Sequence, residues 1–414
     1  MTVATSRIDR RNVPLYYAFT FAYDFLLWFG IWIKYLIEVR ELQLRWILAM
    51  DLPFWLLVAA LQAPMGALAD RIGRRRVLVA SALLYAVTIL GFGLTTNYWE
   101  LFADYMLWAF AASMRSGTDS ALLFDTLQQS GRANEYAKIA GRGFALRVLA
   151  GAGAIVLGAL LAERIGLART VQLSALSTVI AAAFAWAMRE PAREQVAHDY
   201  LGTLRQGLAF SWRDPEVRYT VLIGSVLLTA AFGPVVLVQP FLLQHQVATA
   251  LYGLYQAPLR LIAFVAAMLA FWVQRRARTG SIIVAACVAM VATYLGLALS
   301  TAIAAFAFFA LPSLVSGLTE PLIGAHLNVR IPSERRATVL SVMPLLFALQ
   351  AAWFEPAIGF FADVHSLRAA FLFAAAYCLV AMPPLLLLWW RAHSRPPTTS
   401  SNPAPSPGES PAAR

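Results

Sequence analysis

The chain is built from long apolar runs, each close to the length that a helix needs to cross a lipid bilayer. About 20 mostly apolar residues in a row span the hydrocarbon core. Of all residues, 60% are hydrophobic and 13% are charged, whereas a soluble globular protein has roughly 45–50% and about 25%. The short alternating segments typical of a membrane β-barrel are missing. We therefore predict an all-α membrane protein with about twelve spanning helices, near residues 14–38, 46–66, 77–95, 100–124, 138–162, 169–188, 218–243, 250–273, 280–299, 302–328, 337–361 and 368–390.

Lysine and arginine residues are distributed unevenly between the predicted loops. With the N-terminus in the cytoplasm, 24 of the 33 lie on the cytoplasmic side and five lie in the opposite loops. Because basic loops stay in the cytoplasm, this bias predicts a multi-pass protein of the cell membrane with both termini cytoplasmic. The net charge of +11 does not indicate a nucleic-acid partner, because the basic residues form short clusters between apolar runs rather than one stripe.

The longest loop lies in the middle of the chain and divides it in two. Apolar residues from Leu201 to Trp212 fall near one helical face, which predicts an amphipathic helix on the inner membrane surface. Short patterns recur at an offset of 200 residues, as in Ser116-Gly117 and Ser316-Gly317. Duplicated halves with a site between them are a common transporter architecture. We predict an N-terminal six-helix bundle (1–189), a cytoplasmic amphipathic linker (190–217), a C-terminal six-helix bundle (218–393) and a disordered cytoplasmic tail (394–414).

The loop between the second and third predicted spans carries a motif of glycines and charges. It reads Gly66-Ala67-Leu68-Ala69-Asp70-Arg71-Ile72-Gly73-Arg74-Arg75-Arg76. The two glycines permit a tight backbone, and the aspartate and first arginine can pair with helix ends. The arginine run attracts anionic inner-leaflet lipids and fixes topology. This pattern resembles motif A of the major facilitator superfamily, and every fixed position matches.

The resemblance implies a transporter with twelve helices and a latch that holds its outward-open state. In this family, motif A pairs with an acid at the cytoplasmic end of helix 4, where this chain has Asp125. Two features depart from the family pattern. The corresponding loop of the second half, 274–280, lacks the aspartate, and helix 5 lacks the Gly-Pro pair of many drug–proton antiporters. The predicted latch residues are Gly66, Asp70, Arg71, Gly73, Arg74 and Asp125.

Several ionisable residues fall inside the predicted spans. Such a group is unfavourable in a bilayer unless it is paired or hydrated, so each is a candidate functional residue. In the superfamily, helices 1, 4, 7 and 10 line the central cavity, which would place Asp24, Asp119 and Glu320 there. Alternatively, these acids form fixed internal bridges with the arginines of helices 4, 5 and 8. The predicted substrate- or proton-binding residues are Asp24, Trp28, Trp32, Asp119, Arg147, Arg260, Glu320 and Glu355.

Other kinds of chemistry leave no signature in the sequence. No Gly-Lys-Ser phosphate loop is present, which argues against an ATP-driven pump. The five histidines show no metal-ligand spacing, and Cys287 and Cys378 sit in apolar runs as packing residues. We therefore expect no cofactor, no metal and no enzymatic activity.

Together these features predict a monomeric secondary transporter that moves a small molecule by alternating access. Proton-coupled export of an amphipathic solute is the preferred hypothesis, with Asp24 as the proton-binding group and Glu320 as the second choice. Uptake of a polar anionic or zwitterionic metabolite is the alternative, because Arg147 and Arg260 lie beside acids. A receptor or scaffold on a transporter fold is a further alternative, but an intact state latch argues against a static protein. The expected partners are the substrate, protons and membrane lipids.

Overall fold

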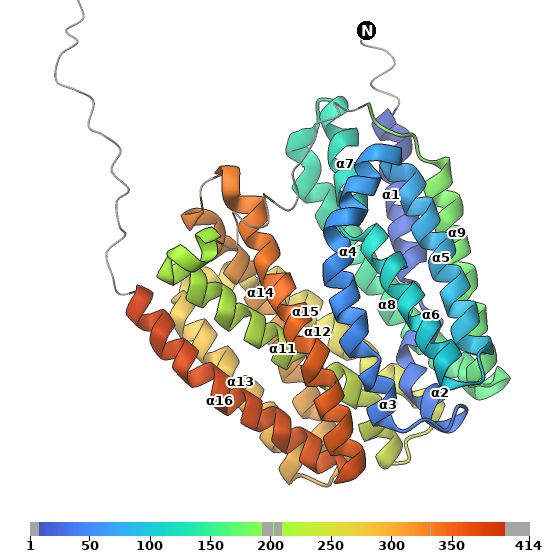
Figure 1. Cartoon of the computed structure of the whole chain (residues 1–414), viewed down its shortest axis with the longest axis vertical. Helices are drawn as coiled ribbons and strands as arrows, with labels where there is room; N and C mark the ends of the chain where they lie inside the picture. The colour runs from blue at the N-terminus through green and yellow to red at the C-terminus, as the bar shows by residue number, and fades with distance from the viewer. Residues whose placement is uncertain (1–7, 193–201, 203–208, 332, 394–414) are drawn as a thin grey trace, which may run out of the picture.

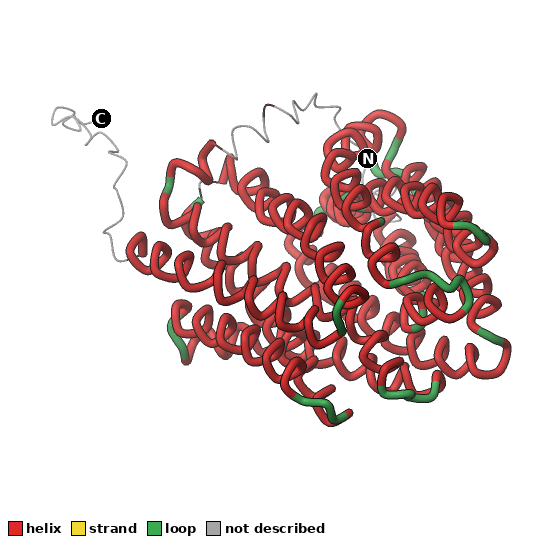
Figure 2. Tube along the Cα trace, turned by 60° about the horizontal axis from the view of Figure 1, so that its bottom comes forward, coloured by secondary structure: helices red, strands yellow, loops and turns green. Residues whose placement is uncertain are grey.

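The computed structural model describes residues 8–192, 202, 209–331 and 333–393, and the described residues form helices and short connections (Figures 1 and 2). The first half contains α1 (Ile8–Asp24), η2 (Leu27–Gly30), α2 (Trp32–Glu38), α3 (Leu44–Ala49), α4 (Asp51–Ile72), α5 (Arg74–Leu94), α6 (Tyr98–Arg115), α7 (Thr118–Gln129), η3 (Ala133–Glu135), α8 (Tyr136–Ile165) and α9 (Leu167–Ala187). The second half contains α11 (Pro215–Gln244), η4 (Thr249–Leu251), α12 (Tyr252–Arg276), α13 (Thr279–Leu299), η5 (Ile303–Phe309), α14 (Ala310–Arg330), α15 (Ser333–Val364) and α16 (Leu367–His393).

The predicted fold class is confirmed. Eleven helical segments of the described chain are long and apolar enough to cross a membrane, and they coincide with predicted spans. The remaining predicted span, the fourth in chain order (100–124), corresponds to α6 and α7, which follow one another with a break between them. The predicted amphipathic linker falls mainly, and the predicted tail wholly, outside the described residues.

Two spans of the first half are interrupted at polar positions. The first span stops being an α-helix after Asp24 and continues through η2 and α2. The fourth span breaks at Ser116-Gly117, where Gly117 takes a left-handed conformation with φ of 76°. The recurring pair Ser316-Gly317 lies inside the continuous helix α14, and a side chain on Gly317 would collide with the carbonyl oxygen of Ala263 on α12. The same two residues therefore break one helix and allow close packing in the other.

Helices of the first half and helices of the second half form two groups (Figure 1). The groups meet along two seams, one between α15 and the pair α3 and α4, the other between α8 and α12. We call the ends of the spans near Ile8, Gly73 and Arg330 the termini face, and the ends near Glu38, Leu94 and Val364 the far face. The backbone amides of Ile33 and Lys34 donate to Gln239 Oε1 across the halves. These contacts close the molecule toward the far face.

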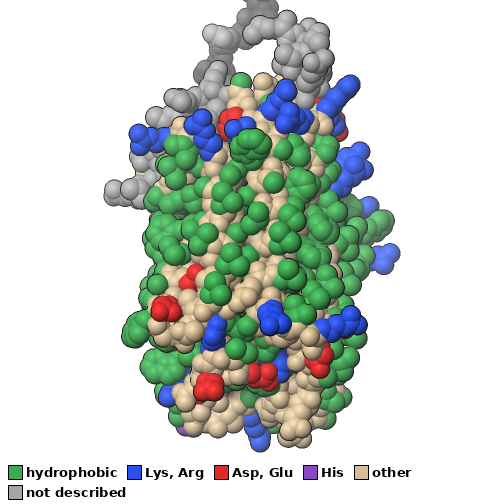
Figure 3. All heavy atoms as spheres, turned by 90° about the vertical axis from the view of Figure 1, so that its right-hand side faces the viewer, with side chains coloured by type: hydrophobic (Ala, Val, Ile, Leu, Met, Phe, Trp, Pro, Cys, Tyr) green, Lys and Arg blue, Asp and Glu red, His purple; other side chains and the backbone are tan. Residues whose placement is uncertain are grey.

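The outer surface has the apolar belt that a bilayer requires. One side of the molecule is covered by hydrophobic side chains over its middle, with arginines and lysines gathered at the end near the termini (Figure 3). Large apolar side chains are widely exposed, for example Trp186 at 70% and Val380 at 75%. In water such exposure would be unfavourable, whereas lipid chains accommodate it. Cys287 and Cys378 are free and buried in the packing of the second half.

Candidate functional site

An aspartate at the break in the first span is the centre of a charged cluster. Asp24 ends α1, and Arg115 at the end of α6 grips its carboxylate with two hydrogen bonds of 2.6 and 3.2 Å. Arg147 of α8 approaches the same carboxylate, with Nε 3.3 Å from Oδ2. The two helix breaks therefore place the end of α1 next to the end of α6, where Asp24 and Arg115 pair. The predicted residues Asp24 and Arg147 lie together.

The cluster balances its charges within the first half. Asp119, in the first turn of α7 directly after the break in the fourth span, has Oδ2 3.5 Å from Arg115 Nε. The Arg115 guanidinium also stacks over the Tyr23 ring at 4.1 Å from its centroid. Two carboxylates thus face two guanidinium groups, and the pairing lowers the penalty of removing them from water. Arg147 is the most accessible member, since 43% of its side chain is exposed, against 11% for Arg115.

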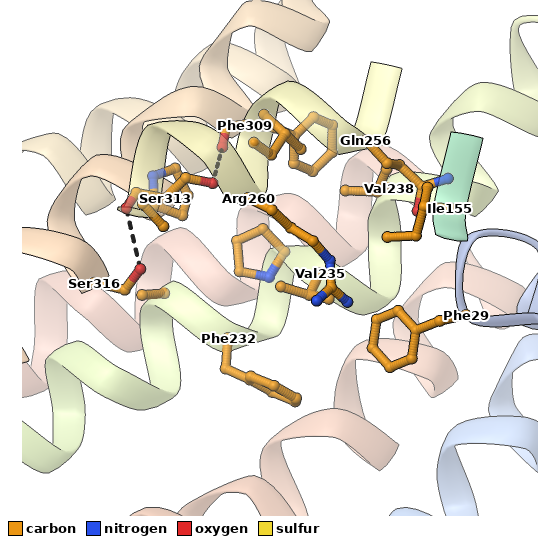
Figure 4. Close-up of a pocket in the computed structure, with 15 residues that line it drawn as sticks. Phe29, Ile155, Phe232, Val235, Val238, Gln256, Arg260, Phe309, Ser313 and Ser316 are labelled. Atoms are coloured by element: carbon orange, nitrogen blue, oxygen red, sulfur yellow. Dashed lines mark hydrogen bonds between the residues drawn. The ribbon is translucent and has the colours of Figure 1, made fainter. Parts of the chain in front are cut away.

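A cavity of about 380 Å³ lies next to this cluster, between the two halves (Figure 4). Phe29 and Ile155 come from the first half, and the remaining lining residues come from α11, α12, η5 and α14. Arg260 of α12 extends into the space, with its guanidinium 4.6 Å from the centre of the Phe29 ring. In the described chain Arg260 makes no ion pair, although Asp24 is near enough to act on it electrostatically. The cavity is therefore mostly apolar with one basic group.

A second cavity, of about 560 Å³, shares Arg260 and continues toward the termini face. Glu320 of α14 lines it, opposite Phe144 of α8. The predicted residues Arg260 and Glu320 therefore border the same space, whereas Asp119 lies within the cluster around Arg115.

The two predicted tryptophans lie elsewhere. Trp28 is 4% exposed and packs inside the first half against Phe92 and Trp108, with ring centroids 5.3 and 5.6 Å apart. Trp32 packs edge-on against Trp28. Neither residue lines the two cavities described above. Sequence spacing places both rings near Asp24, but the helix break after this residue turns Trp28 into the bundle.

Glu355 lies in the seam between the halves rather than in the cavity. It is 2% exposed, and Trp55 of α4 donates to its Oε2 at 3.0 Å. Asp51, at the start of α4, is buried beside it and accepts a 2.6 Å hydrogen bond from Tyr105. The sequence analysis identified Glu355 as a candidate, but nothing in the sequence places it beside Asp51.

The glycine and arginine motif forms a network at the termini face. Gly73 ends α4 with φ of 107°, a conformation that L-residues rarely adopt. The side chain of Arg74 pairs with Asp125 of α7, donates to the carbonyl of Ala121 at 2.8 Å and lies 3.5 Å from Asp70. The structure thus brings the predicted residues Asp70, Arg74 and Asp125 together. Gly66 lies inside α4, and Arg71 is exposed.

Sequence reasoning missed one member of this network. Glu190, just after α9, accepts hydrogen bonds from the backbone amides of Arg74 and Arg75 at 2.7 and 2.8 Å. Its carboxylate thereby caps the N-terminus of α5, where the helix dipole favours a negative charge. In the sequence Glu190 is one acid among the charges of the long loop after the sixth span, so it does not stand out.

A second polar cluster at the termini face joins three helices of the second half. Glu216 of α11 accepts from Arg330 at 2.5 Å and lies 2.6 Å from His393 and 3.2 Å from His326. The ligand atoms of Glu216, His326 and His393 lie within 4.8 Å of one another. The histidine spacing in the sequence does not reveal this cluster. Because Arg330 already occupies the carboxylate, an ion-pair network explains the group without a metal.

Comparisons with known proteins agree with this geometry. The family model described as Major Facilitator Superfamily matches residues 15–354. The crystal structure of the nucleoside transporter NupG has a TM-score of 0.72 at 12% identity, covering 94% of this chain and 100% of that one. A bacterial homologue of the human lysosomal transporter Spinster, in an inward-facing and unoccupied conformation, has a TM-score of 0.73 at 15% identity, with coverage of 95% and 98%. At these identities the structural likeness shows a shared fold. No curated protein sequence matches the chain significantly.

Proposed function

The chain belongs to the Major Facilitator Superfamily, and from this premise we propose that it is a proton-coupled secondary transporter that exports an amphipathic small molecule. The family indicates a membrane transporter rather than an enzyme, and the proposal adds the coupling ion, the direction and the site. The observation that carries it is the Asp24 cluster, which lies beside a cavity between the two halves.

Asp24 is the proposed proton-binding group. As a carboxylate it holds both Arg115 and Arg147, so its charge is balanced inside the protein. A proton on Asp24 would remove that charge and weaken both pairs. The half-exposed Arg147 would then be the first to leave. Proton binding would therefore rearrange side chains next to the cavity, which is the link that coupled transport needs.

Alternating access is supported by the way in which the halves meet. Hydrogen bonds such as those of Gln239 with α2 and of Gln256 with the Gly30 carbonyl join the halves toward the far face. The second cavity lies on the other side of Arg260, toward the termini face. With the termini in the cytoplasm, as the arginine distribution predicts, this is an inward-open arrangement in the cell membrane. Rocking of the two halves would open the other side.

The substrate class follows from the lining of the first cavity. Phe29, Phe232 and Phe309 provide apolar walls, and Arg260, Gln256 and two serines provide a few polar contacts (Figure 4). Such a lining suits an amphipathic solute with one polar end. An amphipathic solute can dissolve in the inner leaflet and enter the cavity from there, which favours export. A second candidate, uptake of an anionic metabolite, is supported by Arg260, which lacks an ion-pair partner among the described residues.

The network around Arg74 lies in the motif that the family resemblance assigns as a latch of the outward-open state, and in the inward-open arrangement described here its contacts lie within the first half. It ties together the ends of α4, α5 and α7, so the first half can move as one rigid body. Gly66, Arg71 and Gly73 complete the motif. A scaffold that never changes state would have no use for such a latch, which favours a transporter over a receptor.

Solute flux in proteoliposomes tests the proposal. A panel of labelled amphipathic and polar solutes would be measured with and without an imposed proton gradient, for the wild type, Asp24→Asn and the matched control Glu163→Gln, an exposed residue at the far face. We expect gradient-driven flux in the wild type and the control, and its loss in Asp24→Asn. If Asp24→Asn shows the same gradient-driven flux as the wild type, this residue has no role in proton coupling. If the solute moves in the same direction as the protons, the result favours uptake over export.

A further inference from the structure

Two carboxyl groups from the two halves of the transporter meet inside the seam near the far face. Asp51 begins α4, and Glu355 lies in α15, about 14 Å along the helix from its end at Val364. Their side chains lie close enough for one carboxyl to donate to the other once it carries a proton, at a place where α4 packs against α15. Asp51 is 3% exposed and Glu355 is 2% exposed, so water has no access to the pair.

Each carboxyl has one oxygen with a donor and one oxygen without. Tyr105 donates to Asp51 Oδ1 at 2.6 Å, and Trp55 donates to Glu355 Oε2 at 3.0 Å. Asp51 Oδ2 and Glu355 Oε1 are fully buried and accept from no donor in the described chain. The other titratable groups that act on the pair are tyrosines, Tyr105 on α6 and Tyr294 on α13. No arginine or lysine among the described residues acts on either carboxyl.

Two ionised carboxylates could not remain in this place. Their charges would repel one another without a cation to offset them, and both would be buried without water. A single proton resolves both problems. One carboxyl then donates an O–H to the other, which satisfies the two oxygens that otherwise lack a partner. Sodium or another metal ion would need several oxygen ligands, and at this place the described residues offer two unpartnered oxygens.

We propose that Asp51 and Glu355 form a proton-binding site that holds the far face of the transporter closed. The inference rests on alternating access as proposed above, but it concerns a second site, separate from Asp24. The donors Tyr105 and Trp55 and the acceptor Asp51 all belong to the first half. Glu355 comes from the second half, so the shared proton joins the halves.

The direction of the effect follows from what opening does to the pair. Separation of α15 from α4 exposes both carboxyls to water on the far side, where each is stable in its ionised form and the shared proton is released. Closure requires a proton to be taken up again. Since the pair is sealed from the termini face, it exchanges its proton with the far compartment alone. It therefore senses the pH of that compartment and carries no proton across the membrane.

The test is a distance measured across the far face as a function of pH. Spin labels at Thr96→Cys in the first half and Thr301→Cys in the second, both exposed in the wild type, would be introduced after Cys287 and Cys378 are replaced by alanine. The distance distribution of the full-length protein in lipid nanodiscs would be recorded from about pH 5 to about pH 9. We expect the open population to grow with pH, by at most roughly tenfold per pH unit for one released proton.

Amide variants separate this site from a general effect of pH. In Glu355→Gln and Asp51→Asn the amide donates permanently to the remaining carboxyl, so the far face should stay closed and the pH response should be lost. Asp363→Asn is the matched control, because the Asp363 carboxylate also crosses the seam, accepting from the Arg45 amide at 2.6 Å without a second acid. This variant should keep the response.

Three results would overturn the inference: no change of distance with pH in the wild type, an unchanged pH response in both amide variants, or a response that follows sodium concentration at fixed pH. None of these bears on the transport role of Asp24. Conversely, Asp24→Asn should lose proton-driven flux but retain the pH-dependent distance, so a failure of the proposed function and a failure of this site are distinguishable.

Discussion

Removal of Arg115 should destabilise the protein mainly because it leaves a carboxylate behind. Arg115 makes two hydrogen bonds to Asp24, and the two side chains are 11% and 23% exposed. Truncating one partner of a buried ion pair costs about 3–5 kcal/mol. Arg147 remains 3.3 Å from the same carboxylate, so the lower end applies. We expect Arg115→Gln to lose about 3 kcal/mol, roughly a 150-fold change in the unfolding equilibrium constant.

A double-mutant cycle distinguishes this explanation from a simple loss of packing. In the double variant Asp24→Asn/Arg115→Gln one carboxylate and one guanidinium are removed together, so the charges of Asp119 and Arg147 remain in balance. Its stability should return to within about 1 kcal/mol of the wild type. Arg142→Gln, which changes an exposed arginine on α8, should shift stability by less than about 0.5 kcal/mol. The free energy of unfolding would be measured by denaturant titration in mixed micelles or bicelles.

Two outcomes would contradict an uncompensated carboxylate at Asp24. If Arg115→Gln costs less than about 1 kcal/mol, the pair contributes no more than an exposed surface bridge. If the double variant is as unstable as the single one, the loss comes from the packing of Arg115 over Tyr23 rather than from an uncompensated carboxylate.

Two further substitutions test the local packing and the loop network. Gly158→Ala on α8 should destabilise the protein by roughly 1–3 kcal/mol, because the new methyl group would collide with the carbonyl of Leu27. Gly153→Ala on the same helix places its methyl group in open space and should not destabilise the protein. Equal melting temperatures of the two variants in detergent would contradict the close approach at Gly158. Glu190→Gln should cost roughly 0.5–2 kcal/mol, because a charged cap of α5 is lost. A matching loss in Glu163→Gln, an exposed acid on α8, would show that the effect is not local.

Different parts of the candidate site were accessible to sequence reasoning to different degrees. Asp24, Arg147 and Arg260 were identified because charges within apolar runs are conspicuous. In the structure Arg147 pairs with Asp24, and Arg260, which lines the neighbouring cavity, lies close to Asp24. Asp125 was identified through the family motif and pairs with Arg74. Glu190 was missed because the residue that it caps is more than 100 positions away in the chain. Trp28 was expected at the cavity, but the end of α1 at Asp24 redirects it into the first half.

The sequence by itself determined the fold class, the positions of the spans and the membership of the family. These are local properties, because a run of apolar residues fixes a spanning helix whatever surrounds it. Tertiary structure alone decided which buried charges meet. Asp51 and Glu355 are 304 positions apart in the sequence, and Glu216 joins His326 and His393 only because the ends of three helices meet. The energy of a charge in a membrane depends on its partners within a few ångströms, and the packing of helices sets these distances.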